Sequence, residues 1–353
     1  MVKCRQHRSK RRTRGISRED TMTLTARIAV LGLSSLMIVG NALAQDRPAA
    51  DTANYPSQTV RLIVPFPAGG PADIVARLLA QKLNESWGQP VIVENRPGAN
   101  TVLAAQQVAR AAPDGHTILV AIDSTLVMNP YLYKSLPYDP SKDFAPITQT
   151  TQSMSVLAVR AEDGPKTVKE LIARAKAEPG KLNYGGGTLT PQLMGYVFNK
   201  AAGIQVQYVP FRGTPATVQG MLTKSVDMVY AATSIALPLV ANGKLRALAR
   251  LDSRNFPAVK DIPTLREAAG FAEFDDLSVW LGLVAPKATP KPIIDKIHRE
   301  VLRILNDPPV KERVDRSGNY INTSKSPEEF GAFIRKEADR WSRVLPETGI
   351  RYD

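Results

Sequence analysis

The pattern of hydrophobic and polar positions after residue 58 alternates between two periods. Residues 59–65 (TVRLIVP) form a short run of β-branched and aliphatic residues, which is typical of a buried strand. Residues 72–83 then place apolar side chains three or four residues apart, including Val75, Leu78 and Leu79, which is the spacing of one helix face. This succession repeats along the chain and predicts an α/β protein built on parallel sheets.

The remaining elements follow from the same two patterns. Further strands are predicted at residues 90–94, 116–122, 155–159, 182–184, 205–210, 227–231, 245–251 and 277–285. Further helices are predicted at residues 101–112, 167–177, 191–202, 215–224, 235–242, 290–305, 309–317 and 327–345. Residues 123–146 contain four prolines and are predicted to form a loop.

The predicted elements are too numerous for one domain of average size. Residues 155–159 resemble residues 279–285, since each is an extended segment followed by proline and a helix. We interpret the two segments as crossings between two lobes. This predicts a discontinuous lobe 1, residues 52–155 plus 283–353, and an inserted lobe 2, residues 156–282.

The first 44 residues follow a different pattern and predict a secretory signal peptide. Lys and Arg are concentrated in residues 1–20, an apolar run fills residues 28–40, and Ala42 and Ala44 supply the small residues of a cleavage site. The alternative, a membrane anchor, needs about 20 apolar residues, more than this run provides. We therefore expect export to the periplasm with cleavage after Ala44.

Two details of the leader leave alternatives open. The pair Arg11-Arg12 invites a twin-arginine interpretation, but the expected continuation is absent. The basic segment is also longer than usual, and a start at Met22 would give a leader of more ordinary length. Residues 1–21 would then not be translated.

The leader also accounts for most of the positive charge. The chain has 46 basic and 33 acidic residues, a net charge of +13. Without the nine basic and two acidic residues of positions 1–44, 37 basic and 31 acidic residues remain, a net charge of +6. This mild balance gives no reason to expect a nucleic-acid partner.

Cysteine and histidine are too scarce in the mature chain for several kinds of chemistry. The single cysteine, Cys4, lies in the leader, so we expect no disulfide, thiolate nucleophile or cysteine metal site. Only His116 and His298 remain, far apart in sequence, so no histidine metal cluster is expected. We predict no cofactor and no metal.

Two strand–turn–helix segments carry glycine-rich turns, VPFPAGGPAD from Val64 and NYGGGTLTPQ from Asn183. Ligands of parallel sheets bind beyond the carboxyl ends of strands, where free N–H groups and the helix dipole favour an anion. Such glycines are also ordinary turn chemistry, but one turn in each lobe favours a shared ligand. The glycine spacing matches neither a dinucleotide fingerprint nor a P-loop.

Several polar residues stand near these predicted strand ends. Asp73 either caps the N–H groups of the first helix turn or contacts the ligand. Arg212 suits a ligand carboxylate, although an ion pair within the lobe is an equal alternative. Hydroxyl groups are offered by Ser124 and Thr125 in lobe 1 and by Thr188 and Thr190 in lobe 2. Trp280 is interpreted as a core residue.

Taken together, several segments resemble the receptor family of tripartite tricarboxylate transporters, also called the Bug family of periplasmic solute-binding proteins. The matching segments are YPSQTVRLIVPFPAGGPADIVARLLAQKL, GQPVIVENRPGAN, AAPDGHTILV, LPYDPSKDFAPIT, YVPFRGTPATVQGML, GKLRALA, DIPTLREA and VWLGLVAPKATP. The resemblance implies a bilobed type II periplasmic-binding-protein fold, two Rossmann-like domains joined by two hinge strands. It implies a monomeric receptor without catalytic activity.

The resemblance also implies which residues grip a ligand carboxylate. These are Phe66, Pro67, Ala68, Gly69 and Gly70 in the first turn, and Gly186, Gly187, Thr188 and Thr190 in the second. Asp73, Ser124, Thr125, Arg212 and Ala232 complete the predicted set.

The sequence departs from the family at the positions that would select the ligand. Pro71 replaces a usual Thr or Ser, Gln192 a usual His and Tyr196 a usual Glu, and the second-lobe loop is shorter. A usual Phe-Asp segment contains Tyr230 and no acid. We hypothesise that Tyr196 and Tyr230 favour a less cationic, more aromatic or apolar ligand.

The predicted function is capture of a small carboxylate-bearing solute for delivery to the permease subunits of a tripartite tricarboxylate-type transporter. An alternative is a ligand-sensing adaptor that docks on a sensor kinase. A secreted hydrolase using Ser124 or Asp73 is a third class, but no nucleophile motif or acid pair supports it.

Overall fold

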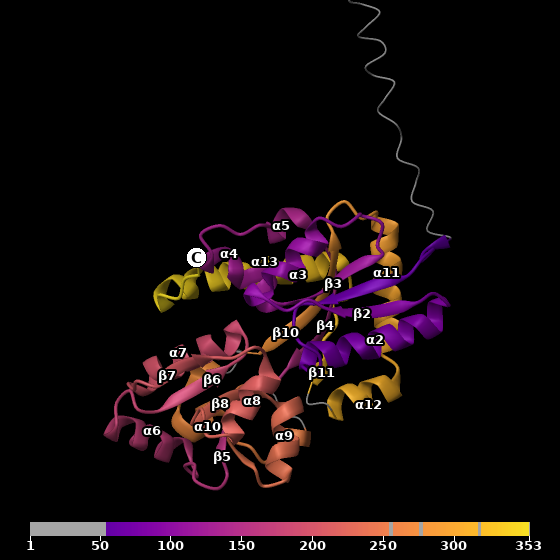
Figure 1. The fold of residues 1–353 in the computed structure, drawn as a ribbon. Coiled ribbons are helices and arrows are strands. Elements are labelled where there is room, and N and C mark those ends of the chain that lie inside the picture. The colour runs from indigo at the N-terminus through magenta and orange to yellow at the C-terminus, as the bar shows by residue number, and fades with distance from the viewer. Residues whose placement is uncertain (1–53, 254–256, 275–277, 317–318, 353) are drawn as a thin grey trace, which may run out of the picture. The chain divides into compact units, whose positions relative to one another are not determined.

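The computed structural model describes residues 54–352 except 254–256, 275–277 and 317–318. The predicted signal peptide, its cleavage site and Cys4 lie outside the described residues. Within residues 54–352 the strands form two separate sheets, one of six strands and one of five (Figure 1). We call the parts built on them lobe 1 and lobe 2.

The sheet of lobe 1 is mixed and has the strand order β11-β4-β10-β3-β1-β2. Strands β1, β2 and β3 are parallel, whereas β10 is antiparallel to both β3 and β4, and β11 is antiparallel to β4. Their bounds are β1 (Val60–Val64), β2 (Val91–Asn95), β3 (Thr117–Ile122), β4 (Phe144–Ser153), β10 (Val279–Pro286) and β11 (Asn319–Ile321).

Helices cover both faces of this sheet. Alternate residues of β1 face opposite layers: Leu62 packs in one cluster with α2 and α11, and Ile63 packs in another with α3. Helix α2 has proline at its first position and ends at Gly88, whose φ of 65° is left-handed. The helices of lobe 1 are α2 (Pro71–Trp87), α3 (Val102–Ala109), α4 (Asn129–Leu132), α5 (Pro140–Asp143), α11 (Lys291–Leu305), α12 (Pro308–Arg316) and α13 (Pro327–Val344).

The sheet of lobe 2 has the order β7-β6-β8-β5-β9. Strand β6 is parallel to β7 and β8, and β5 is antiparallel to β8 and β9. Its strands are β5 (Ser155–Arg160), β6 (Asn183–Gly186), β7 (Gln207–Pro210), β8 (Met228–Ala232) and β9 (Leu245–Arg250). Its helices are α6 (Val168–Ala177), α7 (Leu189–Ala202), α8 (Thr214–Leu222), α9 (Thr233–Ala241) and α10 (Leu265–Ala269).

Short helical turns complete the chain. They are η2 (Ala99–Thr101), η3 (Ser124–Met128), η4 (Pro257–Val259), η5 (Ala272–Phe274) and η6 (Leu345–Thr348).

The chain passes between the two sheets at two places. Met154 alone separates β4 in the first sheet from β5 in the second. The return lies between β9 and β10, and β10 pairs with β4 from Val279 onwards. The two similar segments predicted as crossings therefore lie each within one sheet, next to the crossings. Trp280 is buried, as predicted for a core residue.

Three sequence-based expectations about local structure are wrong. Residues 123–146 are not a plain loop, because they contain η3, α4 and α5. Strand β4 was not predicted, although it is the longest strand of the described residues. Both sheets are mixed rather than parallel, since β5 and β10 each run against their neighbours.

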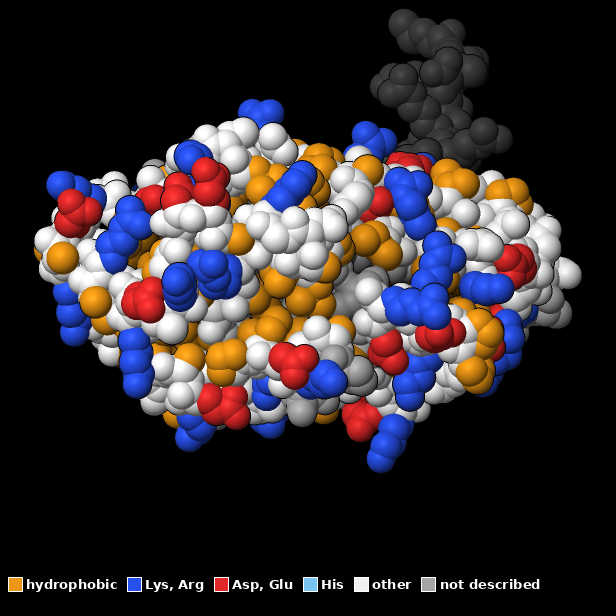
Figure 2. Space-filling model, turned by 90° about the horizontal axis from the view of Figure 1, so that it is seen from below, with side chains coloured by type: hydrophobic (Ala, Val, Ile, Leu, Met, Phe, Trp, Pro, Cys, Tyr) orange, Lys and Arg blue, Asp and Glu red, His pale blue; other side chains and the backbone are white. Residues whose placement is uncertain are grey.

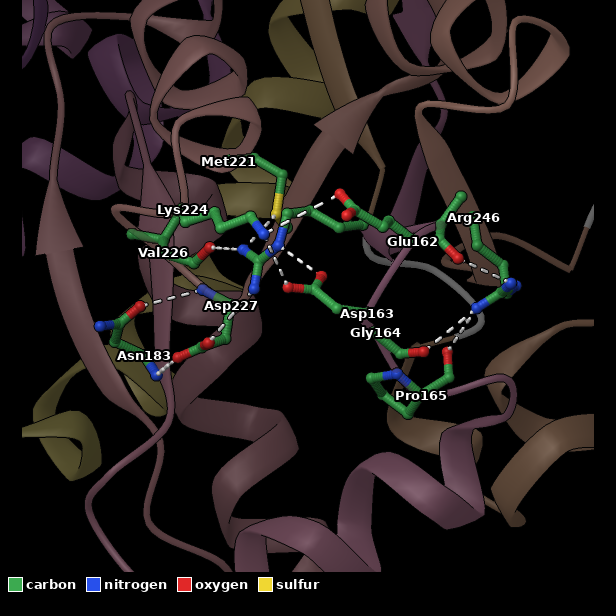
Figure 3. A network of polar contacts seen from close by, with 12 residues as sticks. Glu162, Asp163, Gly164, Pro165, Asn183, Met221, Lys224, Val226, Asp227 and Arg246 are labelled. Atoms are coloured by element: carbon green, nitrogen blue, oxygen red, sulfur yellow. Dashed lines mark hydrogen bonds and ion pairs between the residues drawn. The ribbon is translucent and has the colours of Figure 1, made fainter.

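A polar network fixes the end of lobe 2 at which β5 ends and β8 begins (Figure 3). Arg160 Nε donates to Asp163 Oδ1 at 2.7 Å, and its Nη1 donates to the carbonyl of Val226 at 2.6 Å. Arg246 donates to the carbonyls of Gly164 and Pro165. Since the network precedes Met228, it lies at the opposite end of β8 from Ala232 and stabilises loops rather than a site.

Charged side chains of both signs are distributed over the face seen in Figure 2, with hydrophobic side chains exposed between them. This agrees with the mild charge balance that remains after the leader is set aside. In the described part of the chain, no helix combines the length and the apolar character needed to cross a membrane.

Candidate functional site

The first glycine-rich turn connects β1 to α2 and is held by a buried carboxylate. Gly69 has a φ of 83°, and its N–H donates to Asp73 Oδ2 at 2.9 Å. Asn95 Nδ2 donates at 2.9 Å both to Asp73 Oδ1 and to the carbonyl of Phe66. Arg77 Nε donates to Asp73 Oδ2 at 2.9 Å. Both oxygens of Asp73 are thus used within lobe 1.

The electrostatics of Asp73 fit this internal role. Burial by itself raises the pKa of Asp73, but the hydrogen bonds from Arg77, Gly69 and Asn95 outweigh burial and lower the pKa below its ordinary value of 3.8. The carboxylate therefore stays ionised at neutral pH. The carboxylate satisfies the N–H of Gly69, which precedes α2, and not the N–H groups of the first helix turn that were considered from the sequence.

The second glycine-rich turn connects β6 to α7 and lies against the turn that follows β7. The carbonyl of Gly186 accepts from the N–H of Phe211 at 2.9 Å and from the hydroxyl of Tyr208 at 3.1 Å. A Cβ atom on Gly187 would lie 2.1 Å from the carbonyl carbon of Gly213. Only glycine allows the two backbones to approach this closely.

Two hollows open where these turns face each other, and both are lined by residues of the two lobes. The outer pocket has a volume of ≈ 450 Å³ and is lined on its lobe 2 side by Gly187 and Arg212. The inner chamber has a volume of ≈ 60 Å³ and is lined by Tyr230 and Ala232. Phe66, Pro67, Thr188 and Gly213 line both hollows, so these residues form their common wall.

The structure brings eight of the fourteen predicted ligand-binding residues to the hollows. The eight are Phe66, Pro67, Gly70, Ser124, Gly187, Thr188, Arg212 and Ala232. The other six do not line either hollow: Ala68, Gly69, Asp73, Thr125, Gly186 and Thr190.

Most of the six non-lining residues support the site from behind. The hydroxyl of Thr125 is fully buried and donates to Thr101 Oγ1 at 2.8 Å. Thr190 Oγ1 donates across the two lobes to the carboxylate of Asp123, at 3.3 and 3.4 Å from its two oxygens.

Arg212 is the only charged residue that lines the hollows, and none of their lining residues is Asp or Glu. Its guanidinium group lies at the surface, and no hydrogen bond or ion pair joins it to another residue in the described part of the chain. The internal ion pair considered from the sequence is therefore absent among those residues. The pocket thus presents a positive group without a negative one.

Asp123 is a buried acid at the end of β3 that the sequence analysis did not select. Its Oδ1 accepts from the N–H of Ser124 at 2.6 Å in addition to the contact with Thr190. Burial raises the pKa of Asp123 to about 7; the hydrogen bonds from Ser124 and Thr190 oppose this effect, and the nearby charge of Glu337 adds to it. Near neutral pH this carboxyl is only partly ionised.

The two tyrosines expected to select the ligand have different positions. Tyr230 lines the inner chamber. Tyr196 lines neither hollow and donates from its hydroxyl to the carbonyl of Glu347 at 2.8 Å, so its expected role is wrong. Helix α7 carries Tyr196 on the side that faces the C-terminal segment, because Tyr196 lies about one turn beyond Gln192, whose side chain accepts a hydrogen bond from Tyr352.

Prolines stand in the first turns of three helices at the site; the sequence analysis selected Pro71 as a departure from the family but missed Pro191 and Pro215. Pro71, Pro191 and Pro215 line the inner chamber from α2, α7 and α8. The signal was visible in the sequence, because proline near a helix start removes one of the few N–H groups that are free there.

Two lobes that share a pocket between the ends of their strands define a bilobed solute-binding protein. Residues 75–350 match the family described as "Tripartite tricarboxylate transporter family receptor", and the chain belongs to this family. The Protein BugT of Bordetella pertussis is 33% identical over 336 residues, 94% of this chain and 99% of BugT. The family consists of solute-binding receptors and not of enzymes.

Solved structures agree with the bilobed type II fold. The periplasmic binding protein BugD is 31% identical, with a TM-score of 0.79, covering 85% of this chain and 100% of BugD. MatC from Rhodopseudomonas palustris with bound malate is 33% identical, with a TM-score of 0.76 and coverages of 82% and 100%. An R. palustris protein with adipate is 27% identical, with a TM-score of 0.80 and coverages of 84% and 99%. These comparisons confirm the predicted fold and family.

Proposed function

We propose that this chain captures a small carboxylate-bearing organic solute between its two lobes and delivers it to a tripartite tricarboxylate-type membrane transporter. One observation carries the proposal. The outer pocket presents the guanidinium of Arg212, which has no partner among the described residues, and none of the lining residues is acidic. An organic anion supplies the missing partner, whereas a cationic solute would meet only repulsion.

The chemistry of the pocket supports a carboxylate in particular. A guanidinium can bind the two oxygens of a carboxylate in parallel, which gives both attraction and a fixed orientation. The hydroxyls of Ser124 and Thr188 stand in the wall as further donors. Malate and adipate, named with two of the related structures, are small organic acids of this kind.

Capture follows from the division of the site between two lobes. We place the boundaries between the lobes at the two crossings, which are Met154 and the segment between β9 and β10. These positions differ by a few residues from the boundaries predicted from the sequence. A solute that contacts both lobes binds the closed form better than the open form, and it therefore shifts the population toward closure. The closed, loaded receptor is the form that the transporter would recognise.

The place of action is the periplasm, after removal of the leader behind Ala44. Mass spectrometry of the chain recovered from the periplasm of an expressing cell tests this point. The expected mature N-terminus is Gln45. A chain retained in the cytoplasm with its leader intact would contradict the proposed localisation.

The binding proposal is tested by isothermal titration calorimetry with aliphatic acids, aromatic acids and amino acids. Arg212→Ala should weaken binding of the preferred acid about 10- to 100-fold, because a hydrogen bond to a charged group contributes about 1.5–3 kcal/mol. Arg174→Ala removes an exposed arginine of α6 that lines neither hollow, and this variant should bind as the wild type does. Binding of a cationic solute in preference to every acid would contradict the proposal.

Delivery needs a separate test in cells. Uptake of the preferred acid, labelled with ¹⁴C, should fall to background when the gene for this chain is deleted and should return with the wild-type gene. Return with the Arg212→Ala gene to the full wild-type rate at limiting solute concentration would contradict a role of the pocket in delivery.

A further inference from the structure

Helix α7 of lobe 2 contacts the C-terminal residues of lobe 1, which are drawn in yellow in Figure 1. The hydroxyl of Tyr352 donates to Gln192 Oε1 at 2.7 Å, and the hydroxyl of Tyr196 donates to the carbonyl of Glu347 at 2.8 Å. Lys200 Nζ lies 3.4 Å from Glu347 Oε2. The three residues of α7 are spaced four apart, so they form one face of the helix, and this face meets the other lobe.

The C-terminal residues are fixed on lobe 1. The N–H of Tyr352 donates to the carbonyl of Leu132 at 2.9 Å, and the ring of Tyr352 lies 5.2 Å from the ring of Tyr133. Leu345, at the start of η6, is fully buried. Burial raises the pKa of Tyr352 above its ordinary value of 10.0, so its hydroxyl keeps the proton that it donates. Residues 345–352 therefore reach lobe 2 from a firm base in lobe 1.

The partner residues on α7 are fixed within lobe 2. The carbonyl of Gln192 accepts from the hydroxyl of Tyr184 at 3.0 Å. Helix α7 packs against β6 and β8 and buries Leu193, Met194 and Phe198 on its other side. The contact therefore joins two parts of the molecule that are each held in place by their own lobe.

The contact between α7 and the C-terminal residues is not closely packed. A side cavity of ≈ 430 Å³ adjoins it, with apolar walls from both lobes, including Val197 of α7 and Val344 of α13. Tyr196, Lys200 and Glu347 line this cavity as well. Protein cores contain few voids larger than a water molecule, so a contact beside such a cavity depends mainly on its polar groups. It can open and close without disrupting a core.

The contact lies outside the solute pocket. Gln192, Tyr196, Glu347 and Tyr352 line neither the outer pocket nor the inner chamber. Gln192 and Tyr196 are also two of the positions at which the chain departs from the family pattern. An ionised glutamate at position 196, the usual residue, only accepts hydrogen bonds and could not donate to the carbonyl of Glu347. The tyrosine is therefore suited to the contact between the lobes.

We propose that residues 345–352 and the face of α7 formed by Gln192, Tyr196 and Lys200 are a latch that holds the two lobes together. The latch stabilises the closed form, in which these residues touch, whichever solute is bound. The apparent affinity for a solute rises with the fraction of the protein in the binding-competent form. The effect of the latch on affinity rests on the proposed function, because it assumes capture between the lobes.

Single-molecule fluorescence energy transfer in the solute-free protein tests the latch directly. The chain has one cysteine, Cys4, in the predicted leader, so residues 45–353 offer no competing thiol. Dyes are placed by Ala177→Cys in α6 of lobe 2 and Ala332→Cys in α13 of lobe 1, where both alanines are exposed. Tyr352→Phe and Tyr196→Phe should each lower the ratio of closed to open molecules about threefold, and the double variant about tenfold, as expected for one and two hydrogen bonds.

Tyr55→Phe is the matched control for the loss of a tyrosine hydroxyl. The hydroxyl of Tyr55 donates to the carbonyl of Gly115 at 2.8 Å, entirely within lobe 1. This variant should lower stability against unfolding and keep the wild-type ratio of closed to open molecules. Lys200→Ala removes an ion pair whose two side chains are 66% exposed, so it should change the ratio less than about twofold.

The outcomes separate the latch from the proposed function. A wild type that is entirely open without solute, tyrosine variants that keep the wild-type ratio, or an equal shift in Tyr55→Phe would each overturn the latch. With the preferred acid of the panel, the double variant should bind about tenfold more weakly by calorimetry; unchanged affinity would overturn the role of the latch in capture. If no acid of the panel binds, the proposed function fails, and the solute-free measurement still decides for or against the latch.

Discussion

The two glycine-rich turns that meet at the pocket keep their shapes by different means. In the turn of lobe 1, side chains hold the backbone: Asp73 accepts from the N–H of Gly69, and Asn95 donates to the carbonyl of Phe66. The turn of lobe 2 instead requires a residue without a Cβ atom, because Gly187 lies against the backbone of Gly213. One turn is fastened by hydrogen bonds and the other by contact between main chains.

This difference determines how each turn responds to change. A turn held by several hydrogen bonds can lose one of them and keep the others. A single substitution is therefore expected to distort such a turn only in part. A turn held by main-chain contact has no flexible atoms at the contact, so added volume must move backbone. We therefore expect glycine substitutions to be severe in the lobe 2 turn and milder in the lobe 1 turn, where side-chain substitutions matter more.

The largest effect is expected for Gly187→Ala. Its methyl group would lie 2.1 Å from the carbonyl carbon and 2.3 Å from the carbonyl oxygen of Gly213, so the two turns must separate. Thermal and denaturant unfolding should show a loss of about 3 kcal/mol, near the upper end of the usual range for added volume. Ligand binding should fall below detection, since Gly187 and Gly213 both line the outer pocket.

Gly70→Ala is the matched control in the other turn. Gly70 has an extended backbone, with φ of −82°, and a Cβ atom there would have only the carbonyl oxygen of Pro67 nearby, at an ordinary 3.7 Å. Its unfolding free energy should change by about 0.5 kcal/mol, the scale of a helix N-cap substitution between glycine and alanine. Equal destabilisation by the two substitutions would refute the contrast between the turns.

The second prediction concerns Asp73→Ala, which removes the carboxylate that fastens the lobe 1 turn. Gly69 and Asn95 lose a buried acceptor, which should cost about 2–3 kcal/mol in unfolding free energy. Affinity for the preferred acid should fall about tenfold by calorimetry, a loss of about 1.4 kcal/mol, because Phe66 and Pro67 line both hollows. Arg77→Ala removes only the half-exposed cationic partner and should cost less than about 1 kcal/mol.

Acid titration of stability provides an independent check on Asp73. Its folded pKa is lowered below 3.8, so its contribution is present above the unfolded pKa and is lost as pH falls through the lower folded value. The wild type should therefore lose stability on acidification below about pH 4, and Asp73→Ala should lack this part of the loss. Parallel curves for the two proteins would show that Asp73 does not hold the turn electrostatically.

The sequence predicts a helix of this fold best where apolar side chains recur once per helical turn, and a strand best where they recur at every second residue. Strands β1 and β3 and helix α11 are of this kind, with Ile297 and Val301 one turn apart on the buried face of α11. Strand β4 was not predicted because it buries polar residues, among them Thr148, Gln149 and Thr151. Its pairing on both edges, with β10 and β11, satisfies the backbone, so the hydrophobic alternation that marks a strand is absent.

The site could be predicted from the two backbone turns and from polar residues near other strand ends, such as Ser124 and Arg212. Glycine-rich turns at strand ends are visible in sequence, and they led to Phe66, Gly187 and Thr188, which line the hollows. The direction of a helical side chain is not visible, and this is why Tyr196 was wrongly expected beside the ligand. Asp123 was missed because a single acid after a strand gives no sign that a hydroxyl of the other lobe approaches it.

The third effect, which is the smallest of the three on ligand binding at neutral pH, is expected at the contact between Thr190 and Asp123, and it tests whether the lobe 2 turn depends on lobe 1. Burial raises the pKa of Asp123 to about 7, so the folded protein holds a proton that the unfolded chain releases near 3.8. The stabilisation is complete below pH 3.8 and is lost as pH rises to about 7, by up to about 1.4 kcal/mol per pH unit. Asp123→Asn should flatten the slope of unfolding free energy between pH 5 and 7, measured by denaturant titration.

At neutral pH the same variant should change ligand affinity by less than about threefold, because the amide retains an oxygen that can accept from Thr190 and Ser124. Thr190→Val removes the hydroxyl from the lobe 2 side of the contact and serves as its counterpart. If Thr190→Val shifts the Asp123-dependent slope, the start of α7 and the turn before it are positioned partly by lobe 1. If the slope is unchanged, main-chain contact with Gly213 is sufficient to position the lobe 2 turn, and each turn is then fixed entirely within its own lobe.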